Sequence, residues 1–191
     1  MKILIAIPVY NEELILEKNC LSLLNYCQNF FTNDNFKIVI ADNNSNDNTS
    51  IISQKLSTDH YEINYLFLPD KGKGLAWKKS FLNNEADIYL FMDADLAVDL
   101  SALKPLIENI KNGADLVLGS RFLKNSKVNR SLNRKIISML WNILAKIILK
   151  TKITDLSCGF KAINQKVKEN IISLIKDNSF FARKNWQYSL N

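Results

Sequence analysis

The stretch Phe91-Met92-Asp93-Ala94-Asp95 decides the fold of this chain, because it places two carboxylates directly after an apolar run. The run, residues 88–92, predicts a buried strand, so the two acids follow the end of that strand. Open α/β sheets bind ligands at the carboxyl ends of their strands. Two carboxylates there suit a hard divalent cation, which prefers oxygen ligands and shares them with substrate phosphates. A solvated turn is the alternative interpretation of so short a motif.

Strands and helices alternate on both sides of this motif. Strands are predicted over residues 2–8, 36–41, 63–68, 88–92 and 114–118. Helices are predicted from Asn11 through Leu24, up to Leu56, from Gly72 to Asn83 and from Ser101 onward. Such alternation with short connections indicates βαβ units, and hence an α/β fold with a mainly parallel, Rossmann-like sheet flanked by helices.

Composition indicates one globular domain with a local concentration of positive charge. The chain has 191 residues, of which 47% are hydrophobic and 23% charged. Nine basic residues and no acid lie between Arg121 and Lys152, which leaves the rest of the chain at −3 against the total of +6. Cys20, Cys27 and Cys158 fit no metal spacing and indicate reduced thiols in a cytosolic compartment. We predict no signal peptide and no spanning helix, since no apolar stretch reaches about 18 residues.

Polar groups follow four of the predicted strands. The first loop is Pro8-Val9-Tyr10-Asn11-Glu12, and the second, residues 42–49, is rich in acceptors that suit a nucleobase and a ribose. The third, Lys71-Gly72-Lys73-Gly74, combines glycines that permit close backbone approach with lysines that suit phosphate. The fourth carries Asp93 and Asp95. Together the four loops predict a site for a nucleoside diphosphate and a metal, whereas the second loop alone is more typical of a capped turn.

These motifs resemble those of family-two glycosyltransferases. The resemblance rests on Ile5-Ala6-Ile7-Pro8-Val9-Tyr10-Asn11-Glu12, on Asp42-Asn43-Asn44-Ser45-Asn46-Asp47-Asn48-Thr49 and on Asp93-Ala94-Asp95. Gly119-Ser120-Arg121 and Asp155-Leu156-Ser157-Cys158-Gly159-Phe160-Lys161-Ala162 are similar to the branch that loads glucose or mannose onto dolichyl or polyprenyl phosphate. The match runs in the family's order over residues 3–165. It implies the GT-A fold, a nucleotide-sugar donor, Mg²⁺ or Mn²⁺, and inversion at the anomeric carbon.

The resemblance also implies roles for individual residues. Asp93 and Asp95 correspond to the metal site, Asp42 to the acid that contacts the base, and Arg121 to a phosphate-binding arginine that acts with the two acids in catalysis. The expected donor-binding residues are Pro8, Tyr10, Asn11, Glu12, Asp42, Asn43, Ser45, Lys71, Gly72, Lys73, Asp93 and Ala94. The expected acceptor-phosphate residues are Arg121, Arg130, Arg134 and Ser157. For Arg130 and Arg134 a solvated basic face is the alternative.

The third loop is closer to the glucosyl version, which favours UDP-glucose as donor over GDP-mannose. The chain departs from the family at Asn43, where a second acid is usual, and after Ser157-Cys158-Gly159-Phe160, where members continue with a further acidic element. We therefore predict a catalytic domain over residues 1–175 and a short tail over residues 176–191. A glycan-acceptor transferase and a shortened, inactive nucleotide-sugar-binding domain are the alternatives.

Residues 136–148 form an amphipathic pattern at helical spacing, with Trp141 and flanking lysines. Either a core helix or a helix on an anionic membrane surface explains it. The second interpretation predicts a peripheral protein on the cytoplasmic face of a membrane, with a polyprenyl phosphate lipid and a candidate membrane-protein partner. A nucleic-acid partner is not expected, because acids at the strand ends repel phosphate.

Overall fold

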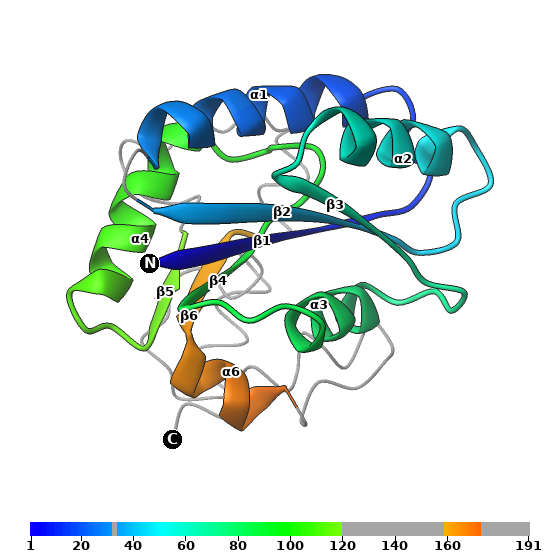
Figure 1. Ribbon diagram of the computed structural model, residues 1–191. Coiled ribbons are helices and arrows are strands. Elements are labelled where there is room, and N and C mark those ends of the chain that lie inside the picture. The colour runs from blue at the N-terminus through cyan, green and yellow to red at the C-terminus, as the bar shows by residue number, and fades with distance from the viewer. Residues whose placement is uncertain (32–33, 120–158, 173–191) are drawn as a thin grey trace, which may run out of the picture.

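The strands of the computed structural model, which describes residues 1–31, 34–119 and 159–172, form one sheet in the order β3-β2-β1-β4-β6-β5 (Figure 1). β1 (Lys2–Val9), β2 (Asn35–Asp42), β3 (Ile63–Phe67) and β4 (Ile88–Phe91) run parallel to one another. β6 (Lys161–Asn164) is antiparallel to both β4 and β5 (Leu116–Leu118). The predicted mainly parallel sheet is confirmed, and β6 is the strand that the sequence pattern did not indicate.

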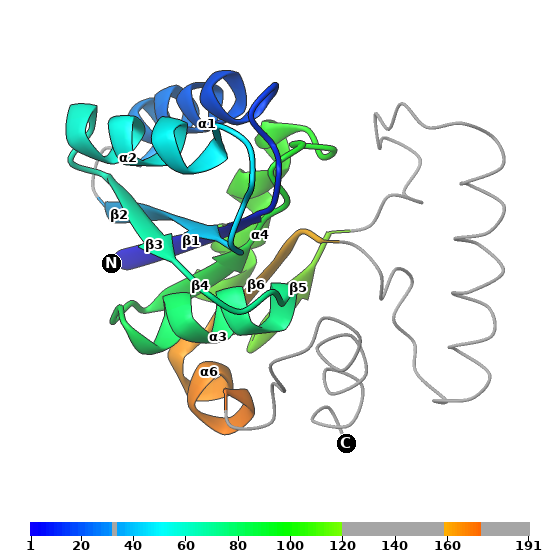
Figure 2. The ribbon, with the colours of Figure 1, turned by 90° about the vertical axis from the view of Figure 1, so that its right-hand side faces the viewer.

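Helices cover both faces of the sheet, as Figures 1 and 2 show. On one face lie α1 (Leu16–Phe30), α2 (Thr49–Asp59) and α4 (Leu103–Lys111), the last preceded by the 3-10 turn η1 (Leu100–Ala102). On the other lie α3 (Lys73–Leu82) and α6 (Gln165–Ile171). The result is a three-layer α/β/α arrangement.

The central strand β1 is buried on both faces, which explains its continuous apolar sequence. Ile3, Ile5 and Ile7 belong to the core under α1 and α4, whereas Leu4 and Ala6 belong to the core under α3. Trp77, Phe81 and Phe91 pack edge to face in that second core, with centroids 4.7–4.8 Å apart for the two pairs that involve Phe91. Strands β1 and β4 are therefore packed between both helix layers.

The chain reverses its direction of travel across the sheet between β1 and β4. It first moves outward through β2 to β3 and then returns to pair β4 with the other side of β1. A crevice opens at the carboxyl ends of the strands at such a switch point. Val9, Asp42 and Phe91 end the strands at this edge, so the loops that follow them meet there.

The first helix begins at Leu16, later than the sequence pattern predicted. Asn11 has a positive φ of 55°, which a right-handed helix does not allow. The backbone N–H groups of Asn11, Glu12 and Glu13 donate to side chains of the second loop, so these residues connect the two loops. Leu14, which falls within the predicted helix, lies before the observed one, and it is 91% exposed.

Cys20 and Cys27 are free thiols on the buried face of α1, and burial raises the pKa of each to about 12. The prediction of reduced thiols is confirmed for these two.

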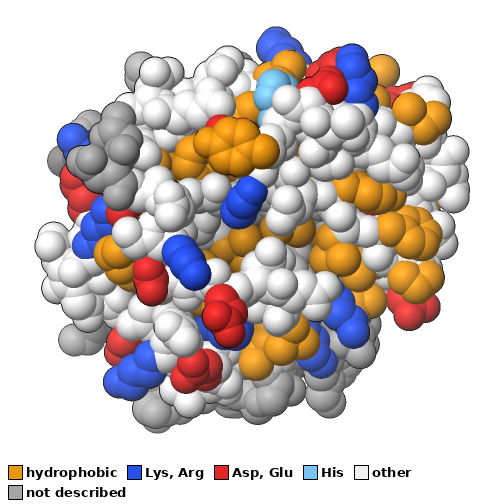
Figure 3. All heavy atoms as spheres, viewed as in Figure 1, with side chains coloured by type: hydrophobic (Ala, Val, Ile, Leu, Met, Phe, Trp, Pro, Cys, Tyr) orange, Lys and Arg blue, Asp and Glu red, His pale blue; other side chains and the backbone are white. Residues whose placement is uncertain are grey.

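Several predicted features lie outside the described residues: the basic segment from Arg121, the amphipathic pattern at 136–148, Cys158 and the tail at 176–191. Within the described ranges, no helix has both the length and the apolar character needed to cross a bilayer. Positive and negative side chains are interspersed over the face shown in Figure 3.

Candidate active site

Loops from four strand ends converge on one cavity of about 400 Å³. The four polar loops that the sequence predicts therefore lie around one site. Most of the predicted donor-binding residues line this cavity, together with Val9, which sequence reasoning missed. The lining residues are Pro8, Val9, Tyr10, Glu12, Asn43, Lys71, Gly72, Lys73, Asp93, Ala94 and Asp95.

The turn after β4 presents both acids to this cavity. The Asp93 carbonyl accepts from the Leu96 N–H at 3.2 Å, and Leu96 adopts a left-handed conformation with φ of 44°. That conformation is costly for leucine, and such strain persists only where surrounding contacts fix it. The Asn19 side chain of α1 supplies one such contact by donating to the Ala94 carbonyl at 2.8 Å. The two carboxylates are thus held on a tight turn, and do not lie on a free loop.

Gly159, just before β6, is packed directly against the Asp93 carboxylate. A Cβ built on Gly159 would lie 2.0 Å from Asp93 Oδ2 and 2.5 Å from Cγ. No side chain fits there, so Gly159 is the residue that leaves room for Asp93. Gly159 belongs to the sequence motif of residues 155–162, but its contact with Asp93 is visible only in the tertiary structure.

The second loop supports the third loop, Lys71-Gly72-Lys73-Gly74, which we call the phosphate loop. Gly72 N–H donates to the Asn43 side-chain oxygen at 3.1 Å, and Asn43 Nδ2 donates to the Val9 carbonyl at 3.2 Å. The two lysines of the phosphate loop have different partners. Lys71 Nζ donates to the Tyr10 hydroxyl at 2.6 Å and lies 4.2 Å from that ring's centroid, whereas Lys73 Nζ forms an ion pair with Asp93.

Hydrogen bonds join the first two loops, and they involve two residues that the sequence assigned to the donor, Asn11 and Ser45. Asn11 N–H donates to Ser45 Oγ at 3.0 Å, and Asn11 Oδ1 accepts from Asn46 N–H at 2.8 Å. Glu13 Oε2 accepts from both nitrogens of Asn48 at 2.8–2.9 Å. Asn11 and Ser45 are therefore placed beside the cavity, and they stabilise the loops that form it.

Asp42 is fully buried, and its carboxylate is surrounded by donors. Oδ1 accepts from the Ser45 N–H and hydroxyl at 3.0 and 2.6 Å, and Oδ2 accepts from Ser50 and Tyr65 at 2.7 and 3.2 Å. Asp42 is absent from the cavity wall. In this structure it organises the second loop, and contact with a base stays a prediction.

Negative charge accumulates at this edge of the sheet. Burial raises the pKa of Glu12 above its ordinary value, and the carboxylates of Asp95, Asp47 and Asp93 raise it further. In the described ranges, no group of three or more His, Cys, Asp or Glu side chains could hold a metal. Two carboxylates beside phosphate-type lysines nevertheless suit Mg²⁺, which takes one or two carboxylates and completes its shell with phosphate oxygens and water.

The predicted acceptor residues Arg121, Arg130, Arg134 and Ser157 lie outside the described residues, so their roles stay predictions. A larger cavity, about 590 Å³, lies at the opposite edge of the sheet, where Lys2, Asp34, Lys37 and Glu62 contribute to its lining. Of the predicted site residues that the structure describes, none lines this larger cavity.

The chain is similar in sequence to known glycosyltransferases. The family model described as Glycosyl transferase family 2 matches residues 4–172. A dolichol-phosphate mannosyltransferase from Pyrococcus furiosus is 34% identical over 90% of this chain and 48% of its own length. A dolichyl-phosphate beta-glucosyltransferase from Trichomonas vaginalis is 33% identical over 81% of this chain and 51% of its own length. The chain thus spans about half the length of these relatives.

Solved structures of similar fold include S. aureus TarS, with a TM-score of 0.63, 21% identity and coverage of 96% of this chain and 53% of TarS. The mannosyltransferase PcManGT from Pyrobaculum calidifontis, solved with GDP-Man and Mn²⁺, gives a TM-score of 0.60 at 18% identity, with coverage of 96% and 51%. At these identities the likeness concerns the fold alone. The GT-A fold expected from the sequence motifs is confirmed.

Proposed function

This chain belongs to glycosyl transferase family 2, and we propose that it transfers a hexose from a nucleotide sugar to a polyprenyl phosphate with inversion at the anomeric carbon. One observation carries the proposal. Tyr10, Lys71, Lys73, Asp93 and Asp95 come from three strand-end loops and line a single cavity at the switch point of the sheet. Ligands of open α/β sheets bind at such a switch point.

The donor's diphosphate belongs next to the phosphate loop. Lys71 and Lys73 supply positive charge there, and the loop carries Gly72, whose lack of a side chain permits close backbone approach. Asn43 supports Gly72 from below, so this part of the site is preformed. UDP-glucose is the favoured donor on the glucosyl character of the loop, with GDP-mannose as the alternative. Relatives named as glucosyl and mannosyl transferases match at nearly equal identity, 33% and 34%.

Asp93 and Asp95 are the residues that would hold Mg²⁺ or Mn²⁺. A bound divalent cation supplies Lewis acidity, which stabilises charge on the departing nucleoside diphosphate. The protein's own part is to fix the two carboxylates, and the Leu96 turn and the Asn19 contact do this. Lys71 and Lys73 offer further positive charge for the leaving group.

The acceptor explains why no strong general base is required. A phosphomonoester has a second pKa of about 6 and carries about −1.5 to −2 charge at neutral pH. It is already an anionic nucleophile, so the harder task is to hold two anions together. Arg121, Arg130, Arg134 and Ser157 are our proposed acceptor residues, since guanidinium groups suit phosphate oxygens.

A lipid acceptor requires the site to reach a membrane surface. We assign this contact to the nine basic residues between Arg121 and Lys152, on the cytoplasmic face. Each basic residue near an anionic surface contributes on the order of 1 kcal/mol, and salt screens the attraction. Binding to vesicles should therefore need anionic lipid and weaken as salt rises. Unchanged binding after Lys146→Glu and Lys150→Glu would assign membrane contact elsewhere.

A donor screen tests the proposal. Purified protein is incubated with radiolabelled UDP-glucose, GDP-mannose or another nucleotide sugar, with or without polyprenyl phosphate and Mn²⁺, and lipid-soluble label is counted. We expect label in the lipid phase only when donor, lipid and Mn²⁺ are all present. Asp95→Asn serves as the inactive control.

Three results would change the proposal. Transfer from GDP-mannose alone would favour the mannosyl alternative, and transfer to a glycan but not to the lipid would replace the acceptor. Nucleotide-sugar binding without transfer under any condition would support a shortened binding domain.

A further inference from the structure

Lys73 and Asp93 form an ion pair at the point where the cation is expected to bind. Their side chains are 34% and 37% exposed, so the pair faces the cavity and is not buried in the core. Lys73 is the first residue of α3, and its ammonium lies 5.1 Å from the centroid of the Trp77 ring one turn further on. The neighbouring Lys71 binds the neutral Tyr10 hydroxyl instead.

We propose that Lys73 is a resident counter-ion for Asp93, which a divalent cation and the donor's diphosphate displace together. Asp93 would then hold the cation, and the Lys73 ammonium would pair with the diphosphate. This inference rests on the proposed function, since it concerns the same metal and donor. It adds that neither ligand binds well alone, because each requires the same ion pair to open.

The ion pair between Lys73 and Asp93 must open because the ammonium and the cation are both positively charged. Lys73 donates to Asp93 Oδ1, which is an oxygen that the cation needs. An ammonium that stays in contact with this carboxylate would lie within a few ångströms of the cation and repel it. In the free protein, Lys73 therefore lowers the affinity of Asp93 for a cation.

Geometry decides which partner moves. The Asp93 carboxylate is packed against Gly159, where an added Cβ would lie 2.0 Å from Oδ2, so little space lies behind it. Its backbone is held in the Leu96 turn. Lys73 has a long side chain on the rim of the same cavity, and the hydrogen bond from Gly72 to Asn43 fixes the backbone from which it extends. Lys73 is thus free to swing toward a diphosphate while Asp93 stays in place.

The consequence is linked binding of cation and nucleotide. Before the donor arrives, Lys73 neutralises Asp93 and limits capture of a cation. When a cation–nucleotide complex enters, two new charge pairs replace the single one that is lost. The affinity of each ligand should therefore rise in the presence of the other, as linkage requires.

Titration calorimetry with Mn²⁺, in the absence and presence of UDP or GDP, tests this with Lys73→Met. A hydrogen bond to a charged group contributes enough that its loss shifts affinity by roughly 10-fold or more. We expect Lys73→Met to bind Mn²⁺ alone about 10-fold more tightly than wild type, and to bind the Mn²⁺–nucleotide complex about 10-fold more weakly. Opposite shifts of this kind do not arise from a merely structural defect.

Lys71→Met is the matched control, since Lys71 lies on the same rim but, among the described residues, contacts the neutral side chain of Tyr10 and pairs with no carboxylate. It should weaken nucleotide binding and leave the affinity for Mn²⁺ alone unchanged. Lys73→Gln is a second variant if Lys73→Met has a lowered melting temperature. Equal affinity of wild type and both Lys73 variants for Mn²⁺ alone, or no Mn²⁺ binding by any of them, would overturn the inference. Failure of both UDP and GDP to bind wild type would instead count against the proposed function, because the Mn²⁺-only comparison needs no nucleotide.

Discussion

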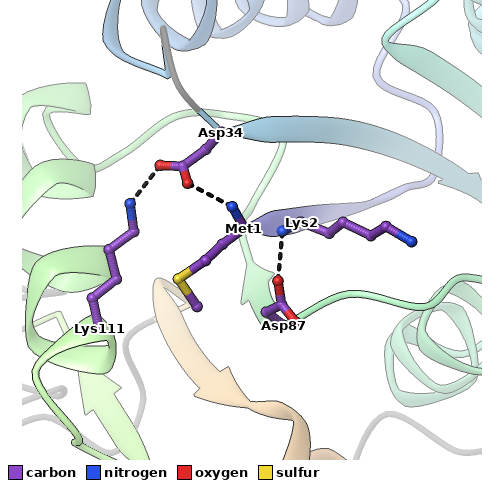
Figure 4. A network of polar contacts seen from close by, with 5 residues as sticks. All are labelled: Met1, Lys2, Asp34, Asp87 and Lys111. Carbon is purple, nitrogen blue, oxygen red and sulfur yellow. Dashed lines mark hydrogen bonds and ion pairs between the residues drawn. The ribbon is translucent and has the colours of Figure 1, made fainter.

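The two edges of the sheet carry the same kinds of charged residue but use them differently. At the amino-terminal edge, Asp34 accepts from the Met1 ammonium at 2.9 Å and pairs with Lys111, and Asp87 accepts from the Lys2 N–H at 2.7 Å (Figure 4). At the carboxyl-terminal edge, Glu12, Asp93 and Asp95 crowd together around a cavity. Their charges repel one another, and among the described residues Lys73 forms an ion pair with Asp93.

The pKa values of the acids follow this difference. Burial tends to raise the pKa of Asp34, but hydrogen bonds from Lys111 and the amino terminus outweigh it, and the pKa lies below its ordinary value. The pKa of Glu12 is raised, first by burial and then by neighbouring carboxylates. The amino-terminal edge is thus satisfied within the protein, whereas the other edge favours an external positive charge. Cavity size does not follow this difference: the larger cavity lies at the amino-terminal edge, and the smaller one lies at the carboxyl-terminal edge, where neighbouring carboxylates repel one another.

The largest expected effect follows loss of one carboxylate from the carboxyl-terminal edge. Asp95→Asn should lower Mn²⁺ affinity by about 100-fold or more, because even changes to groups behind metal ligands cost 10–100-fold. Turnover should fall by orders of magnitude, while the melting temperature changes little. Calorimetry with Mn²⁺ and UDP measures this, with Asp87→Asn at the other edge as the control. Equal affinity of wild type and Asp95→Asn, or binding that survives EDTA, would contradict the metal assignment.

The next effect comes from filling the space behind Asp93. Gly159→Ala puts a methyl group in contact with the carboxylate, so Asp93 must move, and we expect Mn²⁺ affinity to fall about 10–100-fold. Overpacking should also cost about 1–3 kcal/mol of stability. Both are measured on one preparation, by calorimetry and by urea unfolding.

Gly113→Ala is the matched glycine variant. Gly113 has φ of 100° and no atom within 4 Å of an added Cβ, so the substitution is strained through its backbone alone. It should lose about 1 kcal/mol of stability and keep its Mn²⁺ affinity. An equal loss of Mn²⁺ affinity in both glycine variants would mean that Gly159 acts through stability and not through Asp93.

A smaller effect, on stability alone, is expected at the amino-terminal edge. Asp34→Asn removes a carboxylate that pairs with Met1 and Lys111 and should cost about 0.5–1 kcal/mol near neutral pH. Because the folded-state pKa of Asp34 is lowered, this contribution is present above the unfolded pKa of about 3.9 and is lost as pH falls through the folded value. Unfolding curves of wild type and variant should converge in acid. A fall in Mn²⁺ affinity would show that the two edges are not independent.

The smallest expected effect is a gain in stability, whereas the changes above cause losses. Glu12→Gln relieves repulsion at the carboxyl-terminal edge and should stabilise the metal-free protein by on the order of 0.5 kcal/mol in EDTA. Since the folded-state pKa of Glu12 is raised, the gain should be present at neutral pH and vanish as pH falls through that pKa toward the ordinary value of 4.5. Thermal unfolding in EDTA at several pH values measures it. If Glu12→Gln instead destabilises the protein at neutral pH, the contacts of Glu12 within the loop outweigh its repulsion by the neighbouring carboxylates.

Sequence patterns determined the architecture and the edge at which the site lies. Apolar runs of strand length that alternate with helical segments predict a parallel sheet, and the loops after parallel strands necessarily share one edge. The convergence of Tyr10, Lys71, Lys73 and Asp93 on one cavity follows from this. Periodicity and residue type suffice here, because backbone hydrogen bonding and burial of apolar faces govern both.

Only the tertiary structure decided which side chains satisfy one another. It placed Asp42 in a saturated hydrogen-bond network, tied Asn11 to Ser45, and left Asp93 and Asp95 on the cavity. It also placed Gly159 against Asp93, although the two lie on different strand ends far apart in sequence. The physical reason is range: strand and helix patterns are local, whereas hydrogen bonds and steric contacts depend on distances of a few ångströms that the packing of the whole sheet sets.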